Sequence, residues 1–497
     1  SVPTVEEPET PERVIHLESP LVKLGVSTRG GRVVEASLPK FTDTREKKGK
    51  DAPPVDLVGG RPDALGALRL TLEGHAATAS YHVKEEGPAR VVLERESGGV
   101  RVTRTLELDP EGYGVKTWTE LTNTADAPRT VNPQLAFAAH VRAEEKEQGG
   151  FLSGGAPLDQ TTFLCQTPDE LWREAAVHLK EPRDLKGKVA WAGLDRQYFL
   201  TGTVVREGEV VGCHGSLDAE TARLNLQYAA LTLPPGGTVK LGADSYFGPK
   251  QQAWLTRVDP RLTDAIDYGW FGVIVRLLLV LLLWFYSLIP NYGVAIFMLT
   301  LTVKLITLPL TQKSFISMQR MKDLAPRVKE IQTRWAHDKA TQGQKMMELY
   351  KEENVSPLGG CLPMLIQMPV WIALYRTLYT SVELYQQPFI PGWIDDLAQK
   401  DPFYVTPLAL GVVMLVQALL TPQPEDNPQM KYMSYGMPVF FTFIMLALPA
   451  GLTLYMFFNT VLTIVQQLYI KRRFGTPPAA GKAPRSPAPP VGASGRG

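Results

Sequence analysis

The sequence predicts a multidomain protein with two unlike halves. An all-β sandwich is followed by an α-helical membrane region of five spans, which carries a charged helical hairpin. Residues 1 to about 260 contain no long apolar run, whereas residues 268–470 contain several. All 13 methionines lie between Met298 and Met456. The overall net charge of +1 and the 44% hydrophobic content therefore average two different kinds of polypeptide.

The N-terminal half reads as a linker and then a β domain. Residues 1–13 are rich in Pro, Glu and Thr, which predicts a linker. In residues 14–260, short runs alternate apolar and polar side chains between turn-forming residues, a pattern typical of a large sandwich. Short helices are expected near 168–176 and 249–258. The clearest strands are predicted at 90–96, 100–108, 115–122, 198–205, 223–231 and 238–246.

This domain shows no pattern typical of an active site. Its histidines are scattered, and no metal or nucleophile motif is present. The three cysteines, Cys165, Cys213 and Cys361, suggest neither a disulfide framework nor metal-ligand spacing. We therefore expect no cofactor, no metal and no enzyme, and favour a domain that supports or docks partners. An enzyme that acts through the β domain, such as one that modifies sugars, stays open as an alternative.

The segment 267–289 is apolar and long enough to cross a membrane, with Arg276 as its one internal charge. It also carries Trp270 and Trp284, a residue type that favours the headgroup level. If the segment crosses, the β domain lies on the same side of the membrane as the loop after Thr311. If it lies flat, they lie on opposite sides. The residues alone leave both arrangements open.

The first core span is predicted at 292–311, and it carries a single charge, Lys304, well inside the apolar run. An ionisable side chain at that depth costs a few kcal/mol, so it normally faces protein or water. Thr300, Lys304, Thr307 and Thr311 follow one another at spacings of four, three and four, which places them on one helix face. This stripe favours a polar cavity around Lys304. The alternative is a lysine that snorkels to the nearer headgroups.

Four more spans are predicted at 361–382, 403–420, 435–448 and 451–470. The loop 312–356 carries nine Lys and Arg residues, whereas the loop 383–402 has Lys400 against four acids. The positive-inside bias therefore predicts that 312–356 and the basic tail 471–497 are cytoplasmic.

The 312–356 loop should itself form a helical hairpin. Its first helix has an apolar stripe, and Pro326 should either kink this helix or mark its restart. A turn at His337 and Asp338 leads to a second helix over 339–353. The hairpin is either a solvated spacer or an element that docks a partner. The Pro/Ala/Gly-rich tail is expected to be disordered.

Several motifs resemble the signature of the YidC family of membrane protein insertases. The longest is SPLGGCLPMLIQMPVWIALY at 356–375. Others are AWAGLDRQYF (190–199), DYGW (267–270), VKLITLPLT (303–311), KDPFY (400–404) and AGLTLYMFFNTVLTIVQQ (450–467). The resemblance covers nearly the whole chain, and the order of segments looks like the Gram-negative form, whose additional N-terminal span this sequence lacks.

The resemblance implies a periplasmic β domain with a supersandwich fold, an interfacial amphipathic helix at 267–289, and a five-span insertase core at 291–470. It also implies a hydrophilic groove open to the cytoplasm and to lipid, with Lys304 where the family usually has arginine. Gln367, between two prolines, has a second interpretation as an interhelical hydrogen-bond partner. The candidate groove residues are Lys304, Thr300, Thr307, Tyr455, Gln367 and Met456.

The implied function is insertion of nascent membrane proteins into the bacterial inner membrane, without a nucleotide or other cofactor. The implied partners are nascent membrane proteins, the ribosome at the hairpin and basic tail, the Sec translocon, and membrane lipids. A small-solute transporter with a buried cationic substrate site is the alternative, although no internal repeat supports it.

Overall fold

The computed structural model describes residues 11–43, 52–58, 66–73, 79–141, 160–353, 362–420 and 428–474, without the side chains of 313, 315–319, 321–323, 362–367, 428–434, 471, 473 and 474. Most of the predicted linker and nearly all of the predicted tail lie outside these residues. The chain forms two compact units. The first comprises Ser1–Ala295, Ile372–Tyr404 and Phe443–Leu452, and the second comprises Ile296–Trp371, Val405–Thr442 and Thr453–Gly497.

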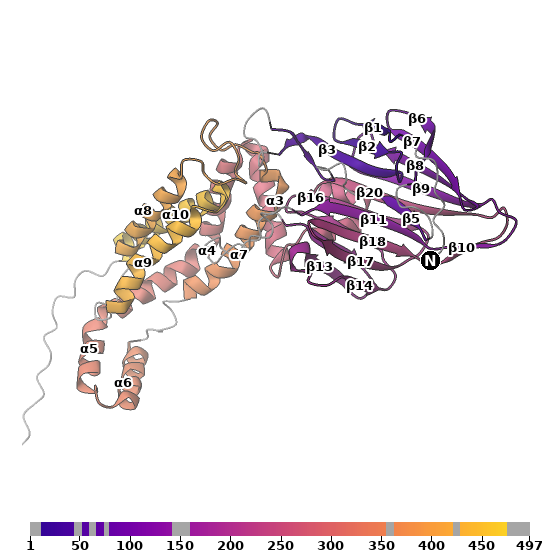
Figure 1. Cartoon of the computed structure of the whole chain (residues 1–497). Coiled ribbons are helices and arrows are strands. Elements are labelled where there is room, and N and C mark those ends of the chain that lie inside the picture. The colour runs from indigo at the N-terminus through magenta and orange to yellow at the C-terminus, as the bar shows by residue number, and fades with distance from the viewer. Residues whose placement is uncertain are drawn as a thin grey trace, which may run out of the picture. The chain divides into compact units, whose positions relative to one another are not determined.

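The first unit is built on a nine-stranded antiparallel sheet (Figure 1). Its strands alternate buried and less buried side chains, as in β8, because one face of the sheet packs on the core. In spatial order they are β13 (Leu171–Ala175), β12 (Thr162–Gln166), β15 (Trp191–Asp195), β16 (Phe199–Glu207), β20 (Thr238–Pro249), β9 (Gly114–Asn123), β8 (Val100–Leu108), β7 (Arg90–Ser97) and β6 (His82–Glu86).

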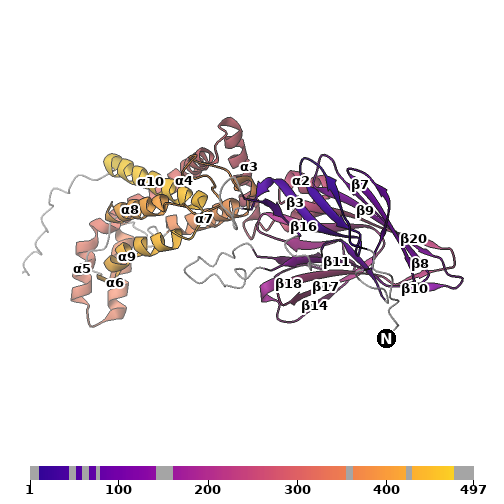
Figure 2. The same cartoon turned by 45° about the horizontal axis from the view of Figure 1, so that its top comes forward.

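A five-stranded antiparallel sheet forms the second layer of the sandwich (Figure 2). Its strands β11 and β18 contact β15 of the large sheet. In spatial order the strands are β14 (Arg183–Lys186), β17 (Val210–Asp218), β18 (Thr221–Tyr228), β11 (Pro133–His140) and β5 (Arg69–Leu72). Two smaller sheets hold β1 (Val14–Glu18), β2 (Lys23–Ser27), β3 (Arg32–Thr42) and β4 (Pro54–Asp56), and β10 (Arg129–Val131) with β19 (Leu231–Leu233).

A disulfide between Cys165 and Cys213 joins the two layers. Cys165 lies on β12 of the large sheet and Cys213 on β17 of the five-stranded sheet, with their Cα atoms 6.6 Å apart. The expectation that the cysteines form no disulfide was therefore wrong. The pairing depends on how the sheets face each other, which the spacing of the cysteines in the sequence does not reveal.

All six of the clearest strand predictions are confirmed by β7, β8, β9, β16, β18 and β20. The helix expected near 168–176 is wrong, because that segment contains strand β13, followed by a short 3₁₀ turn at Ala176–His178. Pairing of β13 with β12 overrides the local helix preference. The other expected helix is present as α2 (Gln252–Val258), followed by a 3₁₀ segment, η3 (Pro260–Ala265).

The first unit continues with α3 (Gly272–Leu288), which lies within the segment that could either cross or lie flat. The buried side chains of α3 are Val275, Leu278, Leu282 and Phe285, which share one face. Its other face is also apolar but exposed, for example at Val273 and Leu277. A second segment of this unit, which contains the 3₁₀ turn η5 (Val382–Leu384), extends to Tyr404.

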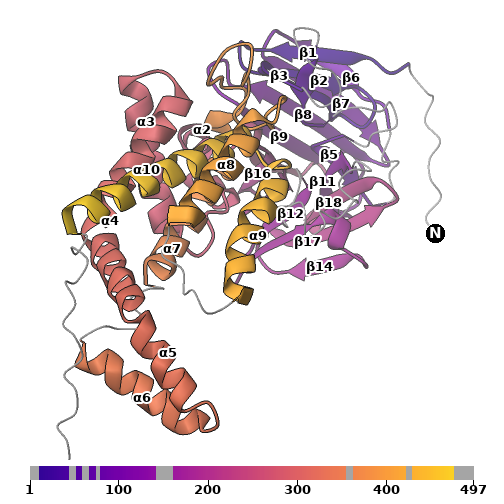
Figure 3. The same ribbon diagram turned by 90° about the vertical axis from the view of Figure 1, so that its left-hand side faces the viewer.

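The remaining helices are α4 (Tyr292–Asp323), α5 (Ala325–Arg334), α6 (Lys339–Glu352), α7 (Leu362–Thr380), α8 (Val405–Leu420), α9 (Pro428–Met445) and α10 (Ala450–Phe474). Helices α5 and α6 lie side by side (Figure 3). The predicted hairpin helices are present: a proline in the first turn of α5 marks the restart, and the Asp338 carboxylate caps α6.

Among the described residues, one helical stretch is long and apolar enough to cross a membrane, Tyr292–Gln312 of α4. Gly272–Leu288, Val405–Leu420 and Tyr435–Met445 are apolar but shorter. The helices α4, α7, α8, α9 and α10 lie at the five predicted spans, and the number of spans that cross the membrane stays a prediction.

Candidate functional site

The polar stripe of α4 is present, and its hydroxyl groups are satisfied within the helix. Thr300 Oγ1 donates to the carbonyl of Ile296 at 2.6 Å, and Thr307 Oγ1 donates to the carbonyl of Val303 at 2.9 Å. Such bonds to the preceding turn remove the cost of placing a hydroxyl in apolar surroundings. The stripe therefore keeps Lys304 as its one charged group.

The ammonium of Lys304 points toward α10. Its Nζ donates to Thr463 Oγ1 at 2.8 Å, and the Thr463 hydroxyl donates in turn to the Asn459 carbonyl at 2.6 Å. Two turns further along α4, Thr311 is hydrogen-bonded to the amide of Gln466 on α10. Polar side chains thus join α4 and α10 at two levels. We call Lys304, Thr311, Thr463 and Gln466 the α4–α10 polar contact.

The Lys304 ammonium has hydrogen-bond donors that the α4–α10 polar contact does not use. An ammonium has three hydrogen-bond donors, and one of them is placed on Thr463. Among the described residues no carboxylate lies within ion-pair distance of Lys304, which is itself only half-buried. The charge is therefore held by a neutral acceptor and stays electrostatically uncompensated by the part of the chain that the structure describes.

The apolar side chains of α4 divide into two groups along the helix. Ile296 and Leu299, near the start of the helix, are each 1% exposed. Ile306 and Leu310, further along, are exposed at 70% and 39%. Apolar side chains at this exposure on a helix long enough to span are typical of a lipid-facing surface. One side of α4 thus carries a cation, and the other is suited to lipid.

Two family models match successive parts of the chain. The model described as YidC periplasmic domain matches residues 14–281, and that described as 60Kd inner membrane protein matches residues 284–477. The membrane protein insertase YidC of Anaeromyxobacter sp. (strain Fw109-5) is 36% identical over 96% of this chain and 87% of its own length. That of Oleidesulfovibrio alaskensis is 36% identical over 93% and 87%. The chain belongs to the YidC family of membrane protein insertases.

The chain is also similar to a solved structure described as an active YidC insertase with its first transmembrane domain resolved. That structure is 18% identical, covers 93% of both chains, and has a TM-score of 0.41. Family membership confirms the resemblance drawn from the motifs. It makes the chain an inner-membrane insertase with a periplasmic domain, and not an enzyme.

The other groove residues inferred from the YidC resemblance lie at different depths. Thr300 and Tyr455 are each 1% exposed, so their side chains are enclosed by protein. Met456 is half-buried, and its Sδ lies 3.0 Å from the indole Nε1 of Trp371 on α7. Gln367 lies on α7, but its side chain is outside the described residues. The structure thus joins Lys304 and Thr311 to α10, and does not bring Tyr455 into an open surface.

Sequence reasoning missed Thr463 and Gln466 as partners of the α4 stripe. The signal was available, because Asn459, Thr463 and Gln466 follow one another at spacings of four and three within an apolar helix. The same criterion identified the stripe on α4. Which polar group meets Lys304, however, depends on the register between the two helices.

The periplasmic domain holds the segment 381–404 through a dedicated contact. The Gln386 side chain makes three hydrogen bonds to Thr42. Its Oε1 accepts from the Thr42 amide at 3.1 Å, and its Nε2 donates to the Thr42 hydroxyl at 2.6 Å and to the Thr42 carbonyl. The Tyr385 ring lies 5.1 Å from that of Tyr198 and 5.6 Å from that of Phe199. Tyr198 and Phe199 are the last two residues of the motif at 190–199.

Asp396 completes this contact from inside the segment. Its Oδ1 accepts hydrogen bonds from the amides of Gln386, at 3.0 Å, and Ala398, at 2.8 Å. Its Oδ2 is buried without a hydrogen-bond partner among the described residues. Burial raises the pKa of Asp396 to about 6, because desolvation disfavours the charged form more than the two amides favour it.

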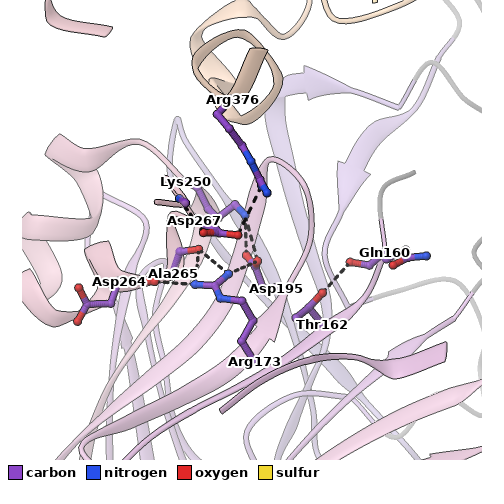
Figure 4. Close-up of polar contacts among 10 residues, drawn as sticks. Gln160, Thr162, Arg173, Asp195, Lys250, Asp264, Ala265, Asp267 and Arg376 are labelled. Carbon is purple, nitrogen blue, oxygen red and sulfur yellow. Dashed lines mark hydrogen bonds and ion pairs between the residues drawn. The ribbon is translucent and has the colours of Figure 1, made fainter. Parts of the chain in front are cut away.

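An ionic cluster fixes the end of the periplasmic domain (Figure 4). The Asp195 carboxylate lies 2.9 Å from Lys250 Nζ and 3.7 Å from the Arg173 guanidinium. Arg173 also donates to the carbonyls of Asp264 and Ala265, immediately before the DYGW motif. Within this motif, Asp267 pairs with Arg376 at 3.5 Å. Arg173 therefore joins the motif at 190–199, through Asp195, to residues that lie two and three positions before the DYGW motif.

Proposed function

We propose that this chain moves hydrophilic segments of nascent membrane proteins across the inner membrane along a polar path beside α4 and α10, and releases their apolar segments into lipid. The proposal rests on one observation: the Lys304 ammonium is hydrogen-bonded to one hydroxyl and pairs with no carboxylate among the described residues. A hydrophilic segment, often acidic, does not cross about 30 Å of hydrocarbon unaided. An uncompensated cation on its path attracts it and lowers that barrier.

The proposed path has a lipid side as well as a polar side. Ile306 and Leu310 expose apolar side chains on the face of α4 away from Lys304. An apolar substrate segment can therefore move into lipid while its polar flank stays near the α4–α10 polar contact. In this proposal Thr300, Thr307, Tyr455, Met456 and Gln367 shape the path, and the planar hydrogen-bond geometry of an arginine is not required.

The proposed arrangement in the membrane follows the segments of the chain. Residues 14–260 form the periplasmic domain and 291–470 the five-span core, with the hairpin 312–356 and the C-terminal tail 471–497 in the cytoplasm, where they meet the ribosome. The segment 267–289 lies flat, which two observations support. Helix α3 has 17 residues, fewer than the roughly 20 needed to span, and it buries a face within the first unit. The disulfide also favours the oxidising periplasm for the β domain. The Sec translocon is proposed as a further partner.

The test compares Lys304→Glu with Lys304→Arg in vesicles that contain the full chain. The substrate is a single-span protein with a short acidic N-terminal tail, and protease protection of the tail measures translocation. Lys304→Glu should reduce insertion about tenfold or more, since one lost attraction of roughly 1.4 kcal/mol already gives that factor. Lys304→Arg should insert normally.

A charge-swapped substrate provides the matched control. With a basic tail of equal length, Lys304→Glu should insert better than it does with the acidic tail. Equal insertion by both variants with the acidic tail would refute the attraction step. Flux of a small solute through the same vesicles, dependent on Lys304, would favour the transporter instead.

A further inference from the structure

A groove of about 650 Å³ lies between α2 and α3 in the first unit. Its walls differ in character. From α2 and the residue before it come polar side chains such as Gln251, Gln252 and Thr256. From α3 come one cation and three apolar side chains: Arg276, Leu279, Val280 and Leu283. We call this hollow the α2–α3 groove.

Along α3, the side chains that line the groove change from charged to apolar. Leu279, Val280 and Leu283 follow Arg276 by three, four and seven residues, which places all four on one side of the helix. Val280 is 63% exposed and Leu283 is 36% exposed. The groove thus offers a cation at one end and about two turns of apolar surface beside it.

Arg276 is free to bind an anion. Its guanidinium stacks over the Tyr268 ring at 5.2 Å, and among the described residues no carboxylate lies within ion-pair distance. The other arginine of the groove, Arg257, is already paired with Asp109 at 3.2 Å. Glu383 also lines the groove, but its side chain is hydrogen-bonded to Gln251 and not to Arg276; burial raises its pKa.

We propose that the α2–α3 groove binds a glycerophospholipid, with its phosphodiester on Arg276 and an acyl chain along Leu279, Val280 and Leu283. A guanidinium matches two oxygens of a phosphodiester, and the amide of Gln252 on the facing wall can donate a further hydrogen bond. The acyl chain accounts for the apolar side chains that line this end of the groove. A free phosphate would use Arg276 and Gln252 and leave this apolar surface uncovered.

The proposal depends on the interfacial position of α3 given under the proposed function. The apolar face of α3 outside the groove supports that position, because Val273, Leu277 and Trp284 are exposed at 85%, 59% and 54%. A lipid in the groove would continue this apolar surface toward α2. It would also couple the periplasmic domain, which carries α2, to the surface of the membrane.

The test is photocrosslinking of the full chain in vesicles of phosphatidylglycerol and phosphatidylcholine. Two phosphatidylglycerol probes carry a diazirine, one in the headgroup and one in an acyl chain, and labelled peptides are mapped by mass spectrometry. The headgroup probe should label 251–257, and the acyl probe should label 279–283. Arg276→Gln should reduce headgroup labelling of 251–257 about tenfold, as expected for the loss of a charge-assisted hydrogen bond.

Three controls separate the outcomes. Arg276→Lys should keep most of the labelling, which shows that the fold tolerates substitution there. Val273→Gln, two turns before Val280 and outside the groove lining, should leave groove labelling unchanged. A diazirine-labelled glycerol phosphate without acyl chains should not label the groove, and labelling by it would favour a free phosphate.

The proposal is overturned if Arg276→Gln labels 251–257 as strongly as the unmodified chain. It is also overturned if labelling of α3 is confined to Val273, Leu277 and Trp284, in which case α3 lies at the membrane but the groove holds no lipid. A complete absence of label on α3 would instead refute its interfacial position. Insertion through Lys304, measured separately, should be retained in Arg276→Gln.

Discussion

The periplasmic domain and the helical core each contain a buried or half-buried cation that has no carboxylate partner among the described residues, but the two cations are bound differently. Arg104 on β8 is 0% exposed, and it donates to the carbonyls of Gly31 and Leu68, each at 2.7 Å. Lys304 on α4 is half-buried and donates to one hydroxyl. Arg104 is enclosed and fixed by backbone, whereas Lys304 keeps donors available for another molecule.

The two regions also differ in the contacts that hold each of them together. The periplasmic domain adds a disulfide between its layers and a buried ion pair, Asp195 with Lys250, whose side chains are each 7% exposed. In the helical core, polar side chains bond the preceding turn or one another across α4 and α10. The periplasmic domain is thus held in a fixed shape, and under the proposed function the interaction of the core is completed by a substrate.

The largest effect should come from removing the covalent link of the periplasmic domain. Replacing Cys165 and Cys213 together by serine removes a cross-link between residues separated by 48 positions. Loop-closure entropy then predicts a loss of about 4 kcal/mol in the free energy of unfolding. Urea unfolding of the full chain in detergent, followed by tryptophan fluorescence, measures this loss.

Cys361 provides the matched control, because it lies outside the β domain in the sequence. Cys361→Ser should leave the unfolding of the periplasmic domain unchanged, and reducing agent should destabilise the unmodified chain but not the double variant. If the double variant were as stable as the unmodified chain, the fixed shape of the domain would not depend on its disulfide.

A smaller effect is expected from Asp396, the buried carboxyl of the segment 381–404. Its pKa is raised from 3.8 to about 6, so the folded state binds the proton more tightly than the unfolded state. Its contribution is therefore most favourable below pH 4 and is lost as the pH rises through 6, by up to about 3 kcal/mol. Asp396→Asn should remove this loss and make the chain more stable at pH 7.5.

The measurement is the difference in thermal midpoint between the variant and the unmodified chain from pH 4 to pH 8. Asp395→Asn is the matched control, because the neighbouring Asp395 is exposed and bonds only the Gly392 amide among the described contacts. The control should keep the pH dependence of the unmodified chain. A difference for Asp396→Asn that stays constant with pH would show that this carboxyl does not titrate in the range.

Local patterns in the sequence predicted most of the fold and part of the site. Alternation identified β8 and β9, and helical spacing identified the Thr300 to Thr311 stripe, because both depend only on neighbours along the chain. The contacts that were missed join distant parts. Cys165 meets Cys213 across two sheets, and Gln386 meets Thr42 over 344 positions. Strand β13 shows the same limit, since its pairing with β12 decides its conformation.

The smallest effect, and the most direct test of the contrast between the two cations, is expected from Thr463→Val. Valine keeps the shape of the side chain but removes the hydroxyl that accepts from Lys304 Nζ at 2.8 Å. An interhelical hydrogen bond in a membrane contributes roughly 0.6 kcal/mol, so insertion of the acidic-tailed substrate should fall about threefold or less. Thr463→Ser, which restores the hydroxyl, should insert normally. A loss as large as that of Lys304→Glu would mean that Lys304 needs a fixed partner as Arg104 does. In that case the core would hold its cation as rigidly as the periplasmic domain holds its own, and attraction by an available ammonium would not explain insertion.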